Sequence, residues 1–547
     1  MVENRQKNLT KTFFSGVLLL SVSTALVKLI GLIYKIPMLS YLGAEGMGYF
    51  NSAYEIYALF CVISTAGLPV ALSVLISGAL SRGAGQTVKR IYRAAMGAFL
   101  LIGLLGSGLM LLFARQFCKL IQSENAYACI LSIAPTVFFV CVSSALRGYF
   151  QGYQKMLPTA LSQLLESVGK LAFGLLFAQI GLQRGYNTAT VAALAGLGLT
   201  LGTAISALYL ILEKLRFHPA EEDVQKDSAS PSAVERTASI WKSLARLAIP
   251  MTLGASLVSL TKLIDMTMIL RRLQAIGYSE VMANEAYGSY TTLALSVFGL
   301  LPSMINSIAL PLVPMLSAAA AAKDRERELQ MVSTSFRLTS LIAIPAALGI
   351  TAFSHPILSL LFGGDPQAVA VSAPLLSCLG ISVFLSCMIT ATNSVLHAYQ
   401  AVNLPILSLL AGAIAKIVVA YLLIGNPLFG MLGAPISTFF CNAIVVLLNL
   451  YFCSGLSQLP SVSTVFFRPL LSGGLAVGVA YTVYALLASV TSGSGLLTVG
   501  GILLSCVLYL ILSCKLGAVW AEDILALPMG KQLYALLTRL HLLSTKE

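Results

Sequence analysis

The sequence predicts an all-α polytopic membrane protein with about fourteen transmembrane helices. Of its 547 residues, 57% are hydrophobic and only 10% are Asp, Glu, Lys or Arg, whereas soluble domains average about 25% charged residues. The mean hydropathy is +0.87, and apolar runs long enough to cross a bilayer as helices recur along the chain. This composition excludes a secreted disulfide scaffold, a disordered chain and an ordinary nucleic-acid-binding protein.

The apolar runs form two groups of six, followed by one further pair. The first group is predicted at 13–36, 52–77, 92–114, 126–149, 157–181 and 189–212. The second group is predicted at 243–270, 286–316, 334–354, 368–397, 404–424 and 431–453. Two C-terminal spans are expected at 466–490 and 496–514.

Four regions follow from this pattern. They are an N-terminal six-helix bundle (1–212), a cytoplasmic linker (213–242), a C-terminal six-helix bundle (243–454), and spans 13 and 14 with an amphipathic tail (455–547). The linker is the only long polar stretch, and such a composition forms no core of its own. Apolar residues at helical spacing between Glu522 and Leu543 predict a tail that lies along the membrane surface.

The basic residues predict the orientation of the spans. If the N-terminus is inside and the spans alternate, inside segments contain 24 of the 34 lysines and arginines and outside segments contain 6. This bias is the one that the positive-inside rule requires. We therefore expect both termini on the cytoplasmic side and an even number of spans.

The two six-span groups repeat each other. Residues 26–30 (LVKLI) match 260–264 (LTKLI) at an offset of 234, and Pro69 matches Pro302 at an offset of 233. Six spans preserve orientation, so the bundles should be related by a pseudo-two-fold axis along the membrane normal, as in transporters with a substrate site between their halves. The two prolines fall inside spans and predict equivalent kinks.

Ionisable residues inside spans are costly and normally face a cavity or a partner. The set comprises Lys28, Lys170, Lys262, Lys416, Glu166 and Asp265, with Glu55 near the start of span 2 and Arg147 near the end of span 4. The repeat pairs Lys28 with Lys262 and Lys170 with Lys416. Polar residues share one helix face with these lysines on spans 1, 5 and 7, which predicts a polar cleft.

Lysine is a compact positive charge that suits phosphate, so we expect the four lysines to bind an anionic head group. The three acids and Arg147 are then charge partners or gating residues. Simpler interpretations stay open: Glu166 and Lys170 are four residues apart and can neutralise each other, Asp265 can pair with Lys262, and a lysine can extend to the interface.

No sequence motif indicates enzyme chemistry. HExxH, GxSxG and GxxxxGK[ST] are absent, and the four histidines are scattered. The sequence therefore predicts no catalytic residue, no cofactor and no metal site. Transport would draw on an ion gradient, the membrane potential or the substrate gradient.

Segments around the first two spans resemble a known family. Residues 54–60 (YEIYALF), 63–69 (ISTAGLP) and 42–49 (LGAEGMGY) are similar to the stage V sporulation protein B family. That family belongs to the multidrug/oligosaccharidyl-lipid/polysaccharide exporter superfamily, with MurJ-type lipid II flippases and polysaccharide flippases among its relatives. The fourteen-span, two-bundle plan extends the resemblance over nearly the whole chain.

The resemblance implies a V-shaped flippase of the bacterial cytoplasmic membrane that works by alternating access. Its implied substrate is an undecaprenyl-pyrophosphate-linked oligosaccharide or a peptidoglycan precursor, and spans 13 and 14 would bind the lipid tail. Lys28 falls where MurJ-type flippases have a span-1 arginine, whereas Tyr34-Lys35 replaces a basic–acidic pair expected shortly after it. Membrane lipids, a coupling ion and cell-wall synthesis enzymes are the implied partners, and nucleic acid is not.

Two other functions compete with this one. A cation-coupled multidrug exporter of the same superfamily predicts that Asp265 or Glu166 is essential for drug resistance. A non-transporting scaffold for cell-wall or spore-cortex synthesis predicts that the lysines of the spans can be replaced without effect on phenotype.

Overall fold

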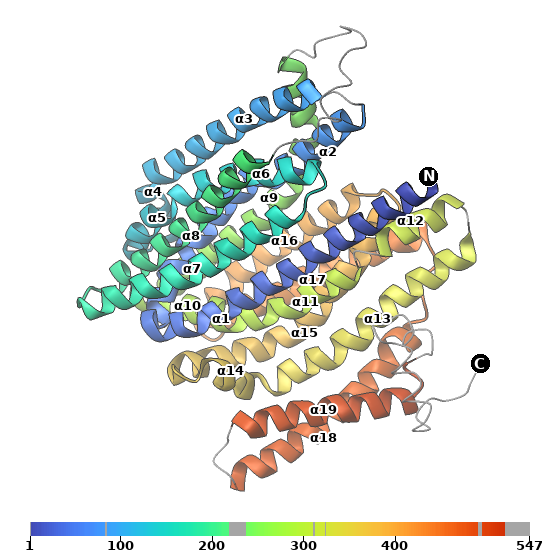
Figure 1. Ribbon diagram of the computed structural model, residues 1–547. Coiled ribbons are helices and arrows are strands. Elements are labelled where there is room, and N and C mark those ends of the chain that lie inside the picture. Colours follow the sequence, from blue (N-terminus) through green and yellow to red (C-terminus); the bar gives the residue numbers. More distant parts are fainter. Residues whose placement is uncertain are drawn as a thin grey trace. The chain divides into compact units, whose positions relative to one another are not determined.

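A computed structural model describes residues 2–82, 85–217, 237–309, 312–322, 324–490 and 495–519. Every regular element in these ranges is helical, so the predicted all-α class is confirmed (Figure 1). Most of the predicted linker 213–242, and all of the predicted surface helix between Glu522 and Leu543, lie outside the described residues.

The chain packs as two compact units. Unit 1 contains Met1–Gln274 and Tyr278–Gly288, and unit 2 contains Ala275–Gly277 and Ser289–Glu547. The helices of unit 1 are α1 (Val2–Thr65), α2 (Leu68–Ser81), α3 (Gly85–Leu112), α4 (Ala114–Ile121), η1 (Glu124–Ala126), α5 (Tyr127–Ile133), α6 (Pro135–Gly152), α7 (Leu157–Gln183), α8 (Thr188–Arg216), α9 (Thr237–Ala275) and α10 (Glu280–Ser289).

Unit 2 contains the remaining helices. They are η4 (Tyr290–Ala294), α11 (Leu295–Ala309), α12 (Leu312–Ala322), α13 (Arg325–Ala352), α14 (Ser354–Phe362), α15 (Pro366–Ala398), α16 (Asn403–Ile424), η5 (Gly430–Leu432), α17 (Gly433–Leu456), η6 (Ser463–Phe467), α18 (Arg468–Val490) and α19 (Gly495–Lys515). Packing places α9 in unit 1, whereas the sequence repeat assigns it to the second bundle, so the bundle limits stay a prediction.

Thirteen helical stretches of the described residues are long and apolar enough to span a membrane, which makes the chain a multi-pass membrane protein. The first stretch, Ser23–Ser81, has 59 residues, although about 20 residues suffice to cross the hydrocarbon core. Gly43 interrupts it with φ 65° and ψ 177°, a conformation that glycine adopts without strain. Two crossings joined at Gly43 are consistent with fourteen spans. The segment 42–49, which lies between predicted spans 1 and 2, is helical on both sides of Gly43.

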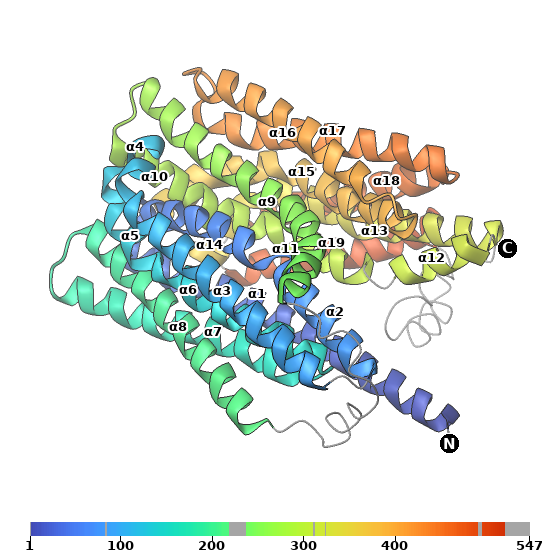
Figure 2. The ribbon, with the colours of Figure 1, turned by 90° about the horizontal axis from the view of Figure 1, so that it is seen from above.

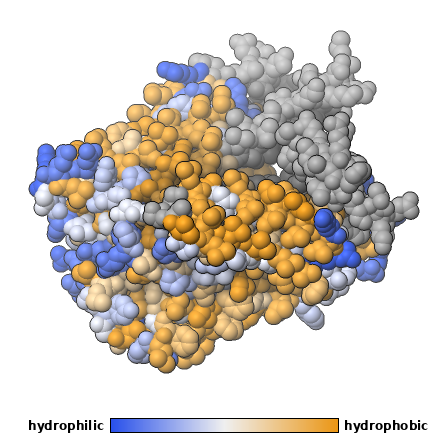
Figure 3. All heavy atoms as spheres, turned by 90° about the horizontal axis from the view of Figure 1, so that it is seen from below, coloured by the Kyte–Doolittle hydropathy of each residue, from blue (hydrophilic) through white to orange (hydrophobic). Residues whose placement is uncertain are grey.

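Large apolar side chains cover the outside of the helices. Leu104 of α3, Ile414 of α16 and Leu447 of α17 are examples of exposed residues of this kind, and Figure 3 shows one face on which hydrophobic residues predominate. A soluble protein rarely exposes apolar patches of this extent. This surface therefore suits contact with lipid chains.

Close packing of α7 against α8 fixes the position of the charged residues on α7. The two helices lie side by side (Figures 1 and 2). A Cβ atom at Gly198 would lie 2.2 Å from the backbone nitrogen of Gly174, and one at Gly202 would lie 2.5 Å from that of Lys170. Small residues allow such approach in membrane helices, and here they set the register of Glu166 and Lys170.

The core of unit 2 lies between α13, α15 and α17. Its buried apolar side chains include Phe336, Met388 and Val446. The α18–α19 pair, which corresponds to predicted spans 13 and 14, packs on α13 and α14. Phe353 contacts the rings of Tyr481 and Tyr484 there, with centroids 5.4 and 5.5 Å apart.

Both prolines flagged by the repeat lie close to helix irregularities. Pro69 occupies the first turn of α2, directly after the break between α1 and α2. The N–H of Gly67 at this break donates to Oγ1 of Thr252 on α9 at 3.2 Å. Pro302 lies inside α11, which follows the π-helix η4. Equivalent kinks therefore stay a prediction with local support at both sites.

Candidate functional site

Charged residues from α1, α7 and α9 form one electrostatic group inside unit 1, which we call the lysine cluster: Lys35, Glu55, Lys170, Lys262 and Asp265. The charges of Lys170, Glu55 and Lys262 all act on Lys35. Those of Lys262, Lys35 and Asp265 act on Glu55. Residues separated by more than 200 positions in the sequence are thus brought together in helices that span the membrane.

Lys170 lies among three aromatic rings. Its Nζ atom is 5.1 Å from the ring centroid of Tyr34, 5.9 Å from that of Phe50 and 4.9 Å from that of Tyr54. Tyr34 and Phe50 are buried and contact each other. Such rings attract a cation through their quadrupoles, by about 2 kcal/mol when water is excluded. The rings therefore restrict the ammonium group to the interior of unit 1.

Glu55 is the carboxylate at the centre of the cluster. Its Oε2 atom is buried and has no hydrogen-bond partner among the residues that the structure describes. A buried carboxylate oxygen without a hydrogen bond is costly. The nearby positive charges of Lys262 and Lys35 offset this cost through space. Glu55 is thus coupled through space to both lysines.

A second charged site connects α6, α7 and α8. Nη2 of Arg147 lies 2.8 Å from Oε2 of Glu166, and the two side chains are 15% and 25% exposed. Nε of Arg147 donates to Oγ of Ser162 at 2.9 Å, and Nη2 also donates to Oγ of Ser206 at 3.2 Å. Glu166 therefore forms its ion pair with Arg147, and Lys170 on the same helix is left to the aromatic rings.

The predicted charged site residues fall into four places. Lys170, Lys262, Glu55 and Asp265 belong to the lysine cluster, in which Lys262 is exposed and Asp265 is half-buried. Arg147 and Glu166 form the second site. Lys28 is exposed on α1, two turns before Lys35 and on the same face. Lys416 is half-buried on α16 of unit 2.

Comparison with known proteins identifies the family. The family described as polysaccharide biosynthesis protein matches residues 13–320, more than half of the chain. The chain belongs to this polysaccharide biosynthesis protein family. A second family, MatE, matches residues 250–422 of the same chain.

Relatives extend this assignment. This polysaccharide biosynthesis family member is 25% identical to stage V sporulation protein B of Bacillus subtilis (strain 168) over 443 residues, which cover 80% of this chain and 83% of the relative. It is 23% identical to the lipid II flippase MurJ of the same organism over 417 residues, covering 74% and 76% of the two chains. The resemblance noted in the sequence is confirmed.

The fold has a solved counterpart. A structure of the lipid II flippase MurJ in an inward closed conformation matches with a TM-score of 0.69 at 15% identity, covering 91% of this chain and 98% of the other. At this identity the likeness establishes the fold alone. The family member therefore has a MurJ-like helical architecture.

Two charged residues that the sequence assigns to segments outside the membrane lie within spanning helices in the structure. Lys35, at the end of predicted span 1 (13–36), is one of the six basic residues counted with the outside segments, whereas α1 continues as helix past it to the break at Gly43. Arg337 was counted with an internal loop, but it lies on α13 and is only 4% exposed. Arg337 lies three residues inside the predicted span 334–354, and this position indicates that it belongs to the span.

Glu45 and Tyr49, from the motif at 42–49, lie in a different polar network. The hydroxyl of Tyr49 donates to Oε1 of Glu45 at 2.9 Å and accepts from Nδ2 of Asn125 at 3.2 Å. The backbone N–H of Asn125 donates to Oε1 of Glu280 on α10 at 2.9 Å. This motif therefore ties α1 to η1 and α10 and lies outside the lysine cluster.

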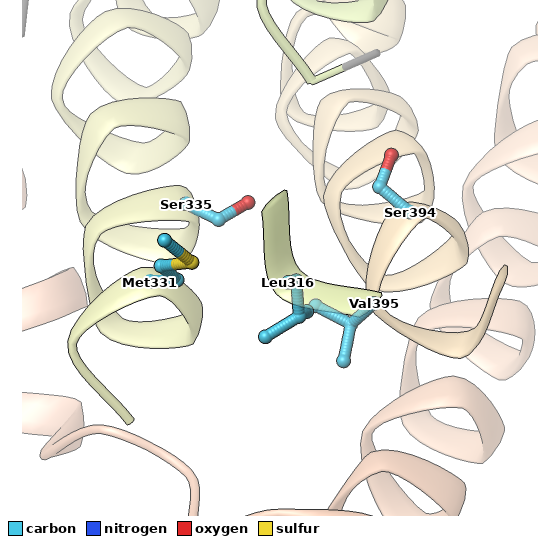
Figure 4. Close-up of a pocket in the computed structure, with 5 residues that line it drawn as sticks. All are labelled: Leu316, Met331, Ser335, Ser394 and Val395. Carbon is cyan, nitrogen blue, oxygen red and sulfur yellow. The ribbon is translucent and has the colours of Figure 1, made fainter. Parts of the chain in front are cut away.

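A small recess in unit 2 does not match the predicted chemistry. Figure 4 shows it lined by Leu316 of α12, Met331 and Ser335 of α13, and Ser394 and Val395 of α15. None of these five side chains is charged. The lysine cluster, by contrast, offers the ammonium groups that an anion needs.

Proposed function

We propose that this protein is a flippase that moves an undecaprenyl-pyrophosphate-linked oligosaccharide, or a lipid II-like peptidoglycan precursor, across the bacterial cytoplasmic membrane by alternating access. The observation that supports this most directly is the lysine cluster within membrane-spanning helices. The named activity of the relative MurJ, a lipid II flippase, agrees with it. We expect the N- and C-termini to be cytoplasmic.

The lysines would bind the phosphates of the head group while the lipid tail stays in the bilayer. Lys262 and Lys28 are exposed and can meet an incoming anion first. Lys35 and Lys170 lie deeper and add positive field. Lysine suits this role because its three N–H donors on a point charge adapt to different phosphate orientations. We place Lys416 in the corresponding role in the second half of the chain.

The acids would release and recapture the lysines during the cycle. Glu55 interacts with Lys262 and Lys35, which a phosphate would bind, so an anion and this carboxylate compete. We place Asp265, whose charge acts on Glu55, in the same role. Movement of a negative head group outward is also favoured by a membrane potential that is negative inside, by about 2.3 kcal/mol per charge per 100 mV. This potential can drive the outward step without a nucleotide.

The regional assignments follow the same proposal. Pro69 and Pro302 would be the bends at which the spans 2 and 8 change shape. The bundles 1–212 and 243–454 would be the moving halves, joined by the linker 213–242, and α18 and α19 within 455–547 would bind the lipid tail.

A cation-coupled multidrug exporter is the second candidate, because MatE matches residues 250–422. The buried Oε2 of Glu55 is the observation in unit 1 that favours it. In that case a cation, and not a lysine, would be the partner of the carboxylates when substrate binds. In that case Glu55→Gln would abolish drug export. Neither wild type nor any variant would move lipid-linked sugars.

The test uses the full-length protein in liposomes with fluorescent lipid II and, separately, a simpler undecaprenyl-pyrophosphate sugar. Protection of the label from an external quencher reports transfer between leaflets. We expect transfer by wild type and loss of at least tenfold in Lys28→Gln/Lys262→Gln. The matched control Lys89→Gln/Lys119→Gln removes the same charge from exposed positions outside the cluster and should transfer normally. No transfer of either lipid by folded wild type would contradict the proposal.

A further inference from the structure

A second group of cations and rings lies at the end of unit 1 where α3 begins and where α6 and α8 end. We call this group the aromatic–basic cluster. It consists of the rings of Tyr92, Tyr149, Tyr153 and Phe217 and of the two lysines Lys155 and Lys214. Ring centroids are 4.9 Å apart for Tyr92 and Tyr149, 5.0 Å for Tyr149 and Tyr153, and 5.1 Å for Tyr153 and Phe217. The rings are tilted or edge-to-face, at interplanar angles of 65°, 56° and 78°, and form one contiguous cluster, which we call the platform.

Both lysines lie on this platform. Nζ of Lys214 is 3.5 Å from the ring centroid of Tyr92, and Nζ of Lys155 is 4.1 Å from that of Phe217. A ring contacts only one side of an ammonium group, so N–H donors on the other side stay available to an anion. The platform therefore orients both cations without neutralising them.

A third cation increases the local positive charge. Arg93, one residue after Tyr92, is exposed, and its charge acts on Lys214. In the part of the chain that the structure describes, none of Arg93, Lys155 and Lys214 forms an ion pair. Like charges close together are unfavourable. An external anion at this position would remove that repulsion.

The surroundings of the cluster indicate which anion. Helix α8 presents Leu208, Leu212 and Leu215 at i, i+4 and i+7, and all three are exposed. Leu215, beside Lys214, is 72% exposed. This stripe leads from the cations along α8 in the direction of the bilayer, because the cluster lies at the ends of spanning helices. A soluble anion would use the cations and leave the stripe uncovered.

We propose that the aromatic–basic cluster binds an anionic phospholipid. Lys155 and Lys214 contact the phosphate diester, Arg93 adds positive field, and an acyl chain covers the leucine stripe of α8. The site is separate from the lysine cluster, whose residues lie on α1, α7 and α9. It would bind a lipid that stays at the surface of the protein and does not pass through it.

The experiment measures lipid binding to the full-length protein by native mass spectrometry in detergent. Phosphatidylglycerol and phosphatidylcholine with identical chains are titrated against wild type, Lys155→Gln/Lys214→Gln, and the control Lys89→Gln/Arg90→Gln. The control removes two exposed charges from the first turns of α3. We expect wild type to prefer phosphatidylglycerol, and the first double variant to bind it about 25-fold more weakly, about fivefold per lysine. The control should stay within twofold of wild type.

Several results would overturn the proposal. These are equal binding of the two lipids by wild type, equal losses in the two double variants, or displacement of phosphatidylglycerol by soluble glycerol phosphate at the same concentration as the lipid. If the glutamine variant fails to fold, Lys155→Arg/Lys214→Arg keeps the charges, and Leu208→Gln/Leu212→Gln removes the apolar stripe. We then expect the arginine variant to keep binding and the stripe variant to lose at least fivefold.

Discussion

The ion pair between Arg147 and Glu166 gives a prediction with a defined magnitude. Replacement of Arg147 by Gln leaves a carboxylate that is only 25% exposed without its partner, and removal of one member of such a pair costs about 3–5 kcal/mol. Replacement of Glu166 by Gln leaves the guanidinium with the two serine hydroxyls, Ser162 and Ser206, as acceptors. We therefore expect Arg147→Gln to be the more damaging of the two changes.

The 2.8 Å separation sets the scale of the coupling. Coulomb's law with an effective dielectric constant of about 20 gives roughly 6 kcal/mol at this distance, before desolvation is subtracted. Because desolvation cancels much of the attraction, the net coupling in a double-mutant cycle should be about 2–3 kcal/mol. The double variant Arg147→Gln/Glu166→Gln should consequently be more stable than Arg147→Gln alone.

The assay measures the thermal midpoint of the purified protein. The protein is heated, and size-exclusion chromatography then measures how much of it stays folded. We expect Arg147→Gln to lower the midpoint by about 3–4 °C, and the double variant to recover part of that loss. A parallel cycle of Glu166→Gln with Lys170→Gln should show weaker coupling, because Lys170 lies on aromatic rings. Additive losses in the Arg147 cycle, or stronger coupling to Lys170, would refute this reasoning.

Three further predictions concern packing, transport and thiol chemistry. Gly202→Ala places a Cβ 2.5 Å from the backbone nitrogen of Lys170 and should destabilise the protein by about 1–3 kcal/mol in thermal assays, whereas Gly478→Ala meets nothing within 4 Å and should be neutral. Lys35→Gln should reduce liposome transfer of a lipid-linked sugar at least tenfold, because it removes a cation that acts on Glu55; unchanged transfer would exclude Lys35 from the site. Burial, together with the charges of Glu124 and Glu280, raises the pKa of Cys118 to about 11, so its labelling by maleimide should rise about tenfold per pH unit from pH 7 to 9, as measured by peptide mass spectrometry. A flat profile would contradict that ionisation.

The positions of the helices were largely predictable from hydropathy. The spans predicted at 157–181 and 404–424 correspond to α7 (Leu157–Gln183) and α16 (Asn403–Ile424). Proline in the first turn fixes the beginning of α7, since its missing N–H is not needed there. Whether a segment inserts into the membrane depends on the apolar content of the whole segment. The positions of the spans can therefore be predicted from one sequence.

The end of span 1 was not predictable in the same way. Gly43, with its positive φ, separates two helices, and the residues on either side are helical. A short polar segment with glycines is typical of a loop, yet helix–helix contacts stabilise it as helix: a Cβ atom at Gly48 would lie 2.1 Å from the backbone oxygen of Asn284. These contacts between helices explain why helical structure continues past the predicted end of span 1.

The partners of the charged residues depend on helix rotation, which the sequence does not specify. Spacing offers Lys170, four residues after Glu166, as the simplest partner of that carboxylate. The α7–α8 contact at the glycines instead orients Glu166 toward Arg147 of α6. Arginine can bind the carboxylate and two hydroxyls at once because its guanidinium has five donors in a fixed plane. Lysine cannot satisfy three acceptors in that geometry equally well.

This distribution of partners explains why the lysine cluster keeps acids of its own. Three rings contribute about 2 kcal/mol to a desolvated ammonium such as that of Lys170, which is less than the several kcal/mol that burial of the ion costs. Glu166 contributes through space, but its direct bond belongs to Arg147. Glu55 is therefore the carboxylate that interacts with Lys35 and Lys262, and we expect it to compensate them when no anion is bound. Loss of Glu55 should raise the affinity for a phosphate and slow its release, whereas a purely structural role would reduce stability without changing affinity.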